Sequence, residues 1–156
     1  MKLESLFEIK ENKLFKISDG TEVNCSNLFV YEADQKNIEI DEDIYNEEFL
    51  ADLREKLKGL DEEEKFALIK IKSDAVLDSE DKIASYINTF NHTARRIKDC
   101  VSVTGFLLSE NILACGKGAV EEFIEALAKK HAQYVHFASK ELCEKYKLLE
   151  LPLVHI

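Results

Sequence analysis

Hydrophobic residues after position 46 recur in two alternating patterns. Apolar residues three or four positions apart predict amphipathic helices. The clearest case runs from 79 to 98, where Ile83, Ile87 and Phe90 lie on one stripe. Short continuous apolar runs between these segments predict strands. The predicted helices cover 47–58, 79–98, about 118–131 and 140–146, and the predicted strands cover 66–72, 101–109, 134–138 and 153–156.

The first forty residues follow a different pattern, in which apolar and polar residues alternate. Segments 6–10 and 13–17 alternate on either side of Glu11-Asn12, which predicts a β-hairpin. Segments 28–31 and 37–40 predict further strands of the same small antiparallel meander. This region could extend the main sheet or cover a site, and an open edge of it could pair with a second copy of the chain in a homodimer.

Helices that alternate with short apolar strands favour parallel pairing with right-handed connections. We therefore predict an α/β fold, in which an N-terminal antiparallel β-meander precedes alternating helices and strands that form a parallel or mixed sheet with packed helices. A tight hairpin of 105–109 and 112–115, with Glu110 at its tip, is the alternative for that part of the chain. Residues 1–156 are expected to form a single domain, with a β-rich extension at 1–40 and an α/β core at 45–156.

Composition narrows the class of protein. The 156 residues carry 31 acidic and 21 basic side chains, so the net charge is −10. An acidic surface repels phosphate groups, which argues against a nucleic-acid partner. The chain has no apolar leader and no stretch near the ~20 apolar residues that span a bilayer, and its four cysteines form no CxxC pair. We expect a soluble cytoplasmic protein with reduced thiols and no membrane partner.

Polar residues follow three of the predicted strands, namely Ser73-Asp74, Ser109-Glu110 and Ser139. In open α/β sheets, ligands bind outside the carboxyl ends of the strands. Asp74 and Glu110 would then share one edge of the sheet, where two carboxylates can divide the acid and base roles of catalysis. Ser73, Ser109 and Ser139 are candidate ligand-binding residues at the same edge. The structural alternative is that Asp74 caps a turn and Glu110 is a solvated loop residue.

A glycine-containing segment, Cys115-Gly116-Lys117-Gly118, precedes the predicted helix near 118. Unpaired backbone N–H groups at a helix start and the charge of Lys117 could hold a phosphate or carboxylate, which glycine allows to approach closely. Gly116, Lys117 and Gly118 are therefore candidate ligand-binding residues, and the simpler alternative is that the glycines only permit a turn. The segment lacks the GxxxxGK[ST] pattern of a P-loop, because Asn111 stands at its first glycine and Gly118 at its Ser or Thr.

Histidines and cysteines form no metal or cofactor pattern. His92, His131, His136 and His155 make no HxH or HExxH motif, and none stands at ligand spacing from a cysteine. We therefore expect neither a metal site nor a cofactor. Among the thiols, Cys115 stands just before a helix start and is the better candidate for a lowered pKa, whereas an inert buried thiol is the simpler expectation.

One helix–strand unit carries a resemblance to a known family: the basic helix end TARRIKD at 93–99, followed by the strand VSVTGFLLSE at 101–110. This unit resembles one of the TIM-barrel glycoside hydrolases, in which the strand closes in Asn-Glu and the Glu is the acid/base. The resemblance would give that role to Glu110, with Ser109 in place of the Asn. It covers fewer than twenty residues, and a complete barrel needs at least ~200, so the chain cannot hold one.

No complete catalytic motif occurs in the sequence. The first expectation is therefore a non-catalytic binding or protein-interaction module, whose partner is an unknown protein or a small polar ligand. The alternative is a small hydrolase or transferase that uses the paired carboxylates of Asp74 and Glu110. The third hypothesis is a regulator that binds a phosphorylated ligand through the loop Gly116–Gly118.

Overall fold

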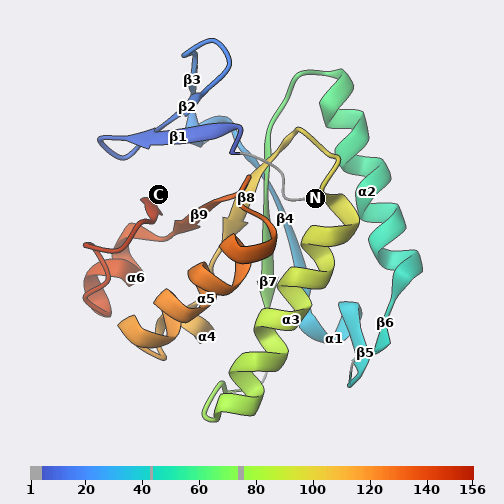
Figure 1. Ribbon diagram of the computed structural model, residues 1–156, viewed down its shortest axis with the longest axis vertical. Coiled ribbons are helices and arrows are strands. Elements are labelled where there is room, and N and C mark those ends of the chain that lie inside the picture. Colours follow the sequence, from blue (N-terminus) through green and yellow to red (C-terminus); the bar gives the residue numbers. More distant parts are fainter. Residues whose placement is uncertain (1–4, 43, 74–75) are drawn as a thin grey trace.

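The computed structural model describes residues 5–42, 44–73 and 76–156, which form an α/β fold (Figure 1). The strands are β1 Phe7–Lys10, β2 Lys13–Lys16, β3 Glu22–Val23, β4 Phe29–Asp34, β5 Glu39–Asp41, β6 Ile44–Tyr45, β7 Ala67–Lys72, β8 Val103–Leu107, β9 Val135–Ala138 and β10 Val154–His155. The helices are α1 Gln35–Ile38, α2 Glu47–Glu62, α3 Glu80–Ile97, α4 Glu110–Leu113, α5 Lys117–Lys130 and α6 Lys140–Lys145, with a 3-10 turn at Cys25–Asn27.

Five strands form a parallel sheet in the order β10-β9-β8-β7-β4. This is the reverse of their order along the chain, so each strand lies beside the one that precedes it in this sheet. The prediction of a parallel or mixed sheet is confirmed, and these five strands are parallel throughout. Right-handed connections between successive neighbours all pass over the same face, so α2, α3 and α5 lie together on one face of the sheet (Figure 1). The carboxyl ends of β4, β7 and β8 share one edge and lead into α1, α3 and α4.

Aromatic side chains from the helices and the central strand build the main core. Tyr86 and Phe90 of α3 stack with their ring centroids 5.0 Å apart. The ring of Phe90 also meets Phe106 of β8 and Phe123 of α5 edge-on, at 5.2 Å and 4.8 Å. All four side chains are fully buried. Burial of this apolar stripe, which the helical spacing predicted, therefore holds α3 on the sheet.

An N-terminal antiparallel sheet of β1, β2 and β3 packs on the parallel sheet without joining its strands. Glu11 and Asn12 have φ values of 51° and 61°, the left-handed values that suit a two-residue hairpin turn. The predicted hairpin is thus confirmed. Phe7 and Leu14 belong to one buried cluster with Leu68 of β7, so the meander covers part of the main sheet.

Two segments that were predicted as strands of the meander lie elsewhere. Segment 28–31 falls largely in β4, which pairs in parallel with β7 at the edge of the main sheet. Segment 37–40 is divided between the end of α1 and the start of β5, which pairs with β6 in a two-stranded sheet. For 28–31 the prediction failed because a period of two identifies a strand but not its neighbour, whereas for 37–38 the element itself differs, since these residues end α1.

The alternative hairpin of 105–109 and 112–115 is also wrong. After β8 the chain forms the short helix α4, with Glu110 in its first turn. Gly105 of β8 lies so close to β9 that a Cβ atom at 105 would stand 1.5 Å from the carbonyl oxygen of Val135. Glycine permits this close approach between neighbouring strands, so Gly105 serves the parallel pairing of β8 with β9.

The four predicted helices are confirmed as α2, α3, α5 and α6. Their starts follow capping rules: the side chain of Asn46 accepts a hydrogen bond from Phe49 N, and that of Ser79 accepts one from Lys82 N. α2 continues to Glu62, beyond the predicted end at 58. Within the described ranges, no helix combines the length and the apolar character that crossing a bilayer requires.

Candidate functional site

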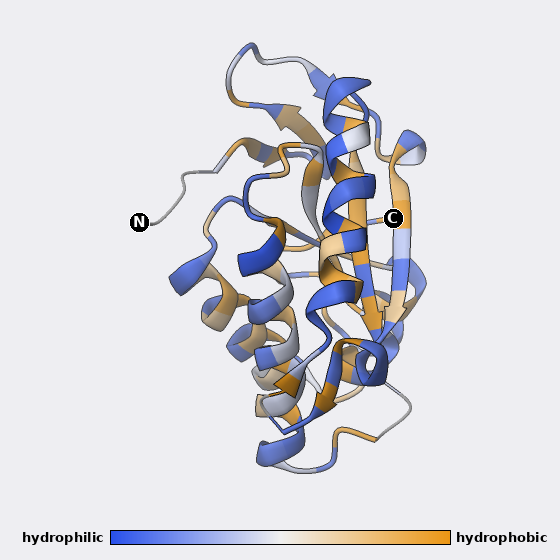
Figure 2. Cartoon of the chain, turned by 90° about the vertical axis from the view of Figure 1, so that its right-hand side faces the viewer, coloured by the Kyte–Doolittle hydropathy of each residue, from blue (hydrophilic) through white to orange (hydrophobic). Residues whose placement is uncertain are grey.

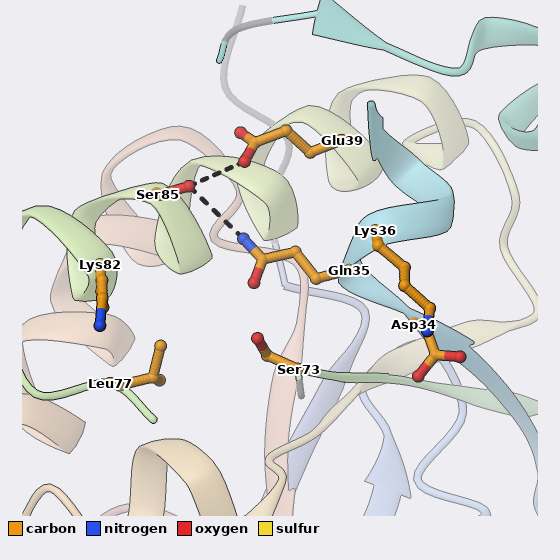
Figure 3. A pocket seen from close by; sticks show the side chains of 8 residues that line it. All are labelled: Asp34, Gln35, Lys36, Glu39, Ser73, Leu77, Lys82 and Ser85. Atoms are coloured by element: carbon orange, nitrogen blue, oxygen red, sulfur yellow. Dashed lines mark hydrogen bonds between the residues drawn. The ribbon is translucent and has the colours of Figure 1, made fainter. Parts of the chain in front are cut away.

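A cavity of about 330 Å³ opens at the carboxyl edge of the parallel sheet, beside the ends of β4 and β7 (Figure 3). Its walls come from the end of β4 with α1 and the start of β5, from the residue that follows β7, and from the segment that begins α3. This edge is where open α/β sheets bind their ligands. The lining residues are Asp34, Gln35, Lys36, Glu39, Ser73, Leu77, Lys82 and Ser85.

Hydrogen bonds connect the polar side chains of one wall. Ser85 Oγ donates to Glu39 Oε1 at 2.8 Å, and Gln35 Nε2 lies 3.5 Å from Ser85 Oγ (Figure 3). The same amide donates to Thr89 Oγ1 at 3.1 Å, and Thr89 donates to the carbonyl oxygen of Ser85 at 3.0 Å. The side-chain oxygen of Gln35 points toward Ser73 (Figure 3). These bonds fix the rotamers, so the polar groups of this wall are held in one arrangement.

One carboxylate oxygen of Asp34, a residue of the cavity wall, has no hydrogen-bond donor within the described part of the chain. Asp34 occupies the N-cap position of α1, yet its side chain makes no capping hydrogen bond. Its Oδ1 atom is buried and accepts no hydrogen bond from any described residue. The ammonium of Lys72 lies 3.8 Å from this atom, beyond hydrogen-bond distance, and 3.4 Å from Glu32 Oε1. This oxygen is therefore buried beside the ammonium of Lys72 rather than offered to the cavity.

The segment that begins α3 adds an apolar and a cationic side chain. Leu77 is only 6% exposed and forms part of the cavity wall. Lys82 Nζ donates to Asp78 Oδ1 at 2.8 Å, and this contact holds the pKa of the Asp78 carboxyl below its usual value. Both side chains are exposed, and such pairs contribute little to stability. Lys82 could therefore exchange Asp78 for a polar group of a ligand at small cost.

Of the candidates from sequence, Ser73 lines this cavity, and Asp74 lies outside the described residues. Sequence reasoning missed Asp34, Gln35 and Ser85. Asp34 follows an apolar run just as Ser73 does, so a parallel assignment of that run would have placed both residues at the same edge. No sequence pattern marked Ser85, because its role depends on the contact between α3 and the segment after β4.

Ser109 and Glu110 follow β8 but make other contacts. The Ser109 hydroxyl is buried 2.8 Å from the hydroxyl of Tyr86 and does not line the cavity. Glu110 is exposed, and its Oε1 accepts hydrogen bonds from Tyr146 at 2.7 Å and Lys145 at 3.2 Å. The hydrogen bond from Tyr146 is the largest cause, followed by the one from Lys145, and together they hold the pKa of Glu110 below its usual value. Glu110 is therefore a carboxylate in an exposed cluster with α6, and its predicted catalytic role stays a prediction.

The remaining candidates lie on two other helix starts. Gly116 precedes α5 with a φ of 97°, the left-handed value that favours glycine. Lys117 Nζ lies 2.7 Å from Glu150 Oε1, and this pair raises the pKa of the lysine. A phosphate at Gly116–Gly118 would have to compete with that carboxylate. Ser139 caps α6 by accepting a hydrogen bond from Leu142 N.

Thiols and imidazoles form no reactive centre within the described ranges. Cys115, the better candidate for a lowered pKa, has the opposite shift, because burial raises the pKa of this thiol, as the simpler expectation of an inert buried thiol implies. Its S–H group contacts the carbonyl oxygens of Leu77 and Asn111 at 3.2 Å and 3.3 Å. Burial lowers the pKa of His136 to about 4. No three His, Cys, Asp or Glu side chains of the described residues stand together in a way that could hold a metal ion.

Comparison with known proteins extends only to the fold. No protein-family model matches the sequence, and no curated protein sequence matches it. The chain is similar in structure to a glycoside hydrolase, GH5_18 from Bifidobacterium longum subsp. longum, whose variant was crystallised in complex with Manβ1-4GlcNAc. The TM-score is 0.57 at 9% sequence identity, over 73% of this chain. This chain spans 35% of that chain, and the likeness shows the α/β fold alone.

Proposed function

We propose that this chain is a binding module for a small polar ligand, held in the cavity at the carboxyl edge of β4 and β7. The convergence of Gln35, Glu39 and Ser85 on one cavity carries the proposal, since they come from segments up to fifty positions apart. Their hydrogen bonds are directed before any ligand arrives. Binding requires only this arrangement of donors and acceptors, together with an apolar wall.

The chemistry of the cavity favours a polyhydroxylated compound, such as a monosaccharide or a polyol. Acceptors are available on the carboxylate of Glu39 and on the side-chain oxygen of Gln35. Lys82 adds a donor, and Leu77 offers an apolar surface to the C–H face of a ring. The volume of about 330 Å³ lies at the lower end of the range for ligand pockets, which fits a single ring rather than an oligomer.

A titration followed by amide chemical shifts tests the proposal. The full chain is titrated with monosaccharides and polyols, one compound at a time. We expect saturable shifts in 34–39, 73 and 82–85, at the cavity wall. Ser85→Ala should weaken binding roughly two- to tenfold, because a hydrogen bond contributes about 0.5–1.5 kcal/mol. Ser18→Ala, which changes an exposed serine that does not line this cavity, is the matched control.

Three outcomes would count against the proposal. The panel could leave the amides of the cavity unchanged. The shifts could instead gather around Gly116–Gly118 or Glu110, which would favour the other predicted sites. Finally, Ser85→Ala could weaken binding no more than Ser18→Ala, which would show that the hydrogen-bonded wall takes no part in binding.

A further inference from the structure

Strand β4 is an open edge of the parallel sheet. Among the described strands it pairs only with β7, in the register Phe29↔Ala67 to Asp34↔Lys72. Phe29 N donates to Phe66 O at 3.0 Å, so Phe29 and every second residue after it bond to β7. The N–H and C=O groups of the intervening residues, Val30 and Glu32, therefore point away from the sheet. They present a row of donors and acceptors to any strand that comes alongside.

A groove runs along this edge between β4 and α2. Its volume is about 220 Å³, and its walls include Tyr31 and Ala33 from the strand and Phe49 and Asp52 from the helix. Figure 2 views the molecule from this side, with α2 in front of the strands and largely polar on its outer surface. Tyr31, Ala33 and Phe49 are partly buried and pack on the main core. The groove thus has an apolar base beneath a polar rim.

The other face of the same edge carries both apolar and acidic side chains. Val30 lies on this face and is 49% exposed, while Phe29, on the groove face with Tyr31 and Ala33, is 44% exposed; both values are unusual for large apolar residues in the longest pairing of the sheet. Glu32 lies on this face, where it pairs with Lys72 at 3.4 Å. Proteins commonly shorten, charge or cover such edges, and an exposed apolar edge is a site of strand addition.

We propose that β4 accepts an extended peptide of a partner protein as a sixth strand of the sheet, seated in the groove between β4 and α2. Main-chain hydrogen bonds to Val30 and Glu32 hold the peptide, and its side chains alternate between the two faces. Those that face the groove are apolar, because they meet Ala33 and Phe49. Those on the other face are basic, because they meet Glu32.

Charge selects this partner over a second copy of the chain. Asp52 and Lys56 line the groove, and Glu32 lies on the opposite face of the edge, where Lys72 pairs with it. The chain as a whole carries a net charge of −10. A basic strand is therefore attracted to the edge, whereas two copies of this acidic chain repel each other. This edge is separate from the polar cavity, so the proposal does not depend on the function proposed above.

Fluorescence anisotropy with two labelled octapeptides tests the proposal, one of alternating Lys and Val and one of alternating Glu and Val. We expect the full chain to bind the Lys-Val peptide saturably and the Glu-Val peptide at least about tenfold more weakly. Val30→Pro removes the outward N–H without touching the ladder to β7, and should weaken binding about tenfold. Glu32→Lys should reduce the preference for the Lys-Val peptide more than Glu55→Lys, which makes the same charge change on α2 outside the groove.

Hydrogen exchange at single amides distinguishes peptide binding at the edge from a folding defect of the variant. The Lys-Val peptide should protect the amides of Val30 and Glu32, while the amide of Tyr31, already bonded to β7, stays unchanged. The proposal would be overturned if neither peptide bound, or if Val30→Pro bound as well as the unaltered chain while its unfolding curve was normal. A dimer in analytical ultracentrifugation that Val30→Pro dissociates would also overturn it, since a second copy would then occupy the edge.

Discussion

Gln35 donates a hydrogen bond from Nε2 to the hydroxyl oxygen of Thr89, 3.1 Å away, although the two residues stand 54 positions apart in the chain. The bond ties the segment after β4 to the middle of α3. Thr89 is fully buried, so its hydroxyl has a fixed place. The wall of the cavity is therefore anchored to the helix layer rather than carried on a free loop.

The first prediction concerns how much the hydrogen bond between Gln35 and Thr89 contributes to the free energy of unfolding. Thr89→Val keeps the shape of the side chain and removes the acceptor, so the free energy of unfolding should fall by about 1–2 kcal/mol. Urea unfolding of Thr89→Val, Gln35→Ala and the double variant measures the coupling. A coupling energy near zero would contradict the contact, because bonded neighbours are expected to be non-additive.

The second prediction concerns Gly105, where β8 approaches β9. In Gly105→Ala the new Cβ atom would stand 1.5 Å from the Val135 carbonyl oxygen and 2.6 Å from its carbon, so the strands must separate. We expect a loss of at least about 3 kcal/mol in the free energy of unfolding, measured with urea. Gly118→Ala is the matched control, since nothing lies within 4 Å of its added Cβ. That change lies in the first turn of α5 and should be neutral or stabilising by up to about 1 kcal/mol.

The third prediction concerns the response of stability to acid. Burial lowers the pKa of His136 from 6.5 to about 4 in the folded chain. Between these values the unfolded chain binds a proton that the folded chain does not, so stability is retained above pH 6.5 and falls as the pH approaches 4. The slope is at most about 1.4 kcal/mol per pH unit, and the loss from this group is on the order of 3 kcal/mol.

His136→Leu isolates this effect, because the carboxylates titrate alike in both chains. Urea unfolding at several pH values between 4 and 7 should show the variant gaining on the unaltered chain as the pH falls. Parallel curves for the two chains would contradict a lowered pKa at His136. A direct titration of its ring carbons by NMR provides the second measurement.

The fourth prediction concerns the buried hydroxyl of Tyr86. It donates to the carbonyl oxygen of Ile71 and stands 2.8 Å from Ser109 Oγ. Tyr86→Phe leaves the buried carbonyl oxygen of Ile71 without this donor and removes one partner of Ser109 Oγ, so the free energy of unfolding should fall by about 1–3 kcal/mol. Tyr146→Phe removes a hydroxyl that bonds to the exposed Glu110 and should change stability by less than about 0.5 kcal/mol. Equal effects of the two variants in thermal or urea unfolding would contradict the burial argument.

The elements and the fold class were predictable from local sequence. The stripe of Ile83, Ile87 and Phe90 predicted α3, and Ser79 predicted its start, because helical spacing and capping depend only on near neighbours. The hairpin at Glu11-Asn12 was predictable for the same reason. Alternation of helices with apolar strands was enough to indicate a parallel or mixed sheet.

The sequence by itself therefore determined the main helices and strands, and that the strands alternating with helices form a parallel or mixed sheet. Only the tertiary structure decided that 29–34 is an edge strand of the main sheet and that Asp34, Gln35 and Ser85 line one cavity with Ser73. A strand's pattern records which face is buried but not which strand lies beside it. The cavity and the open edge both depend on that pairing, so neither exists until distant segments have packed together.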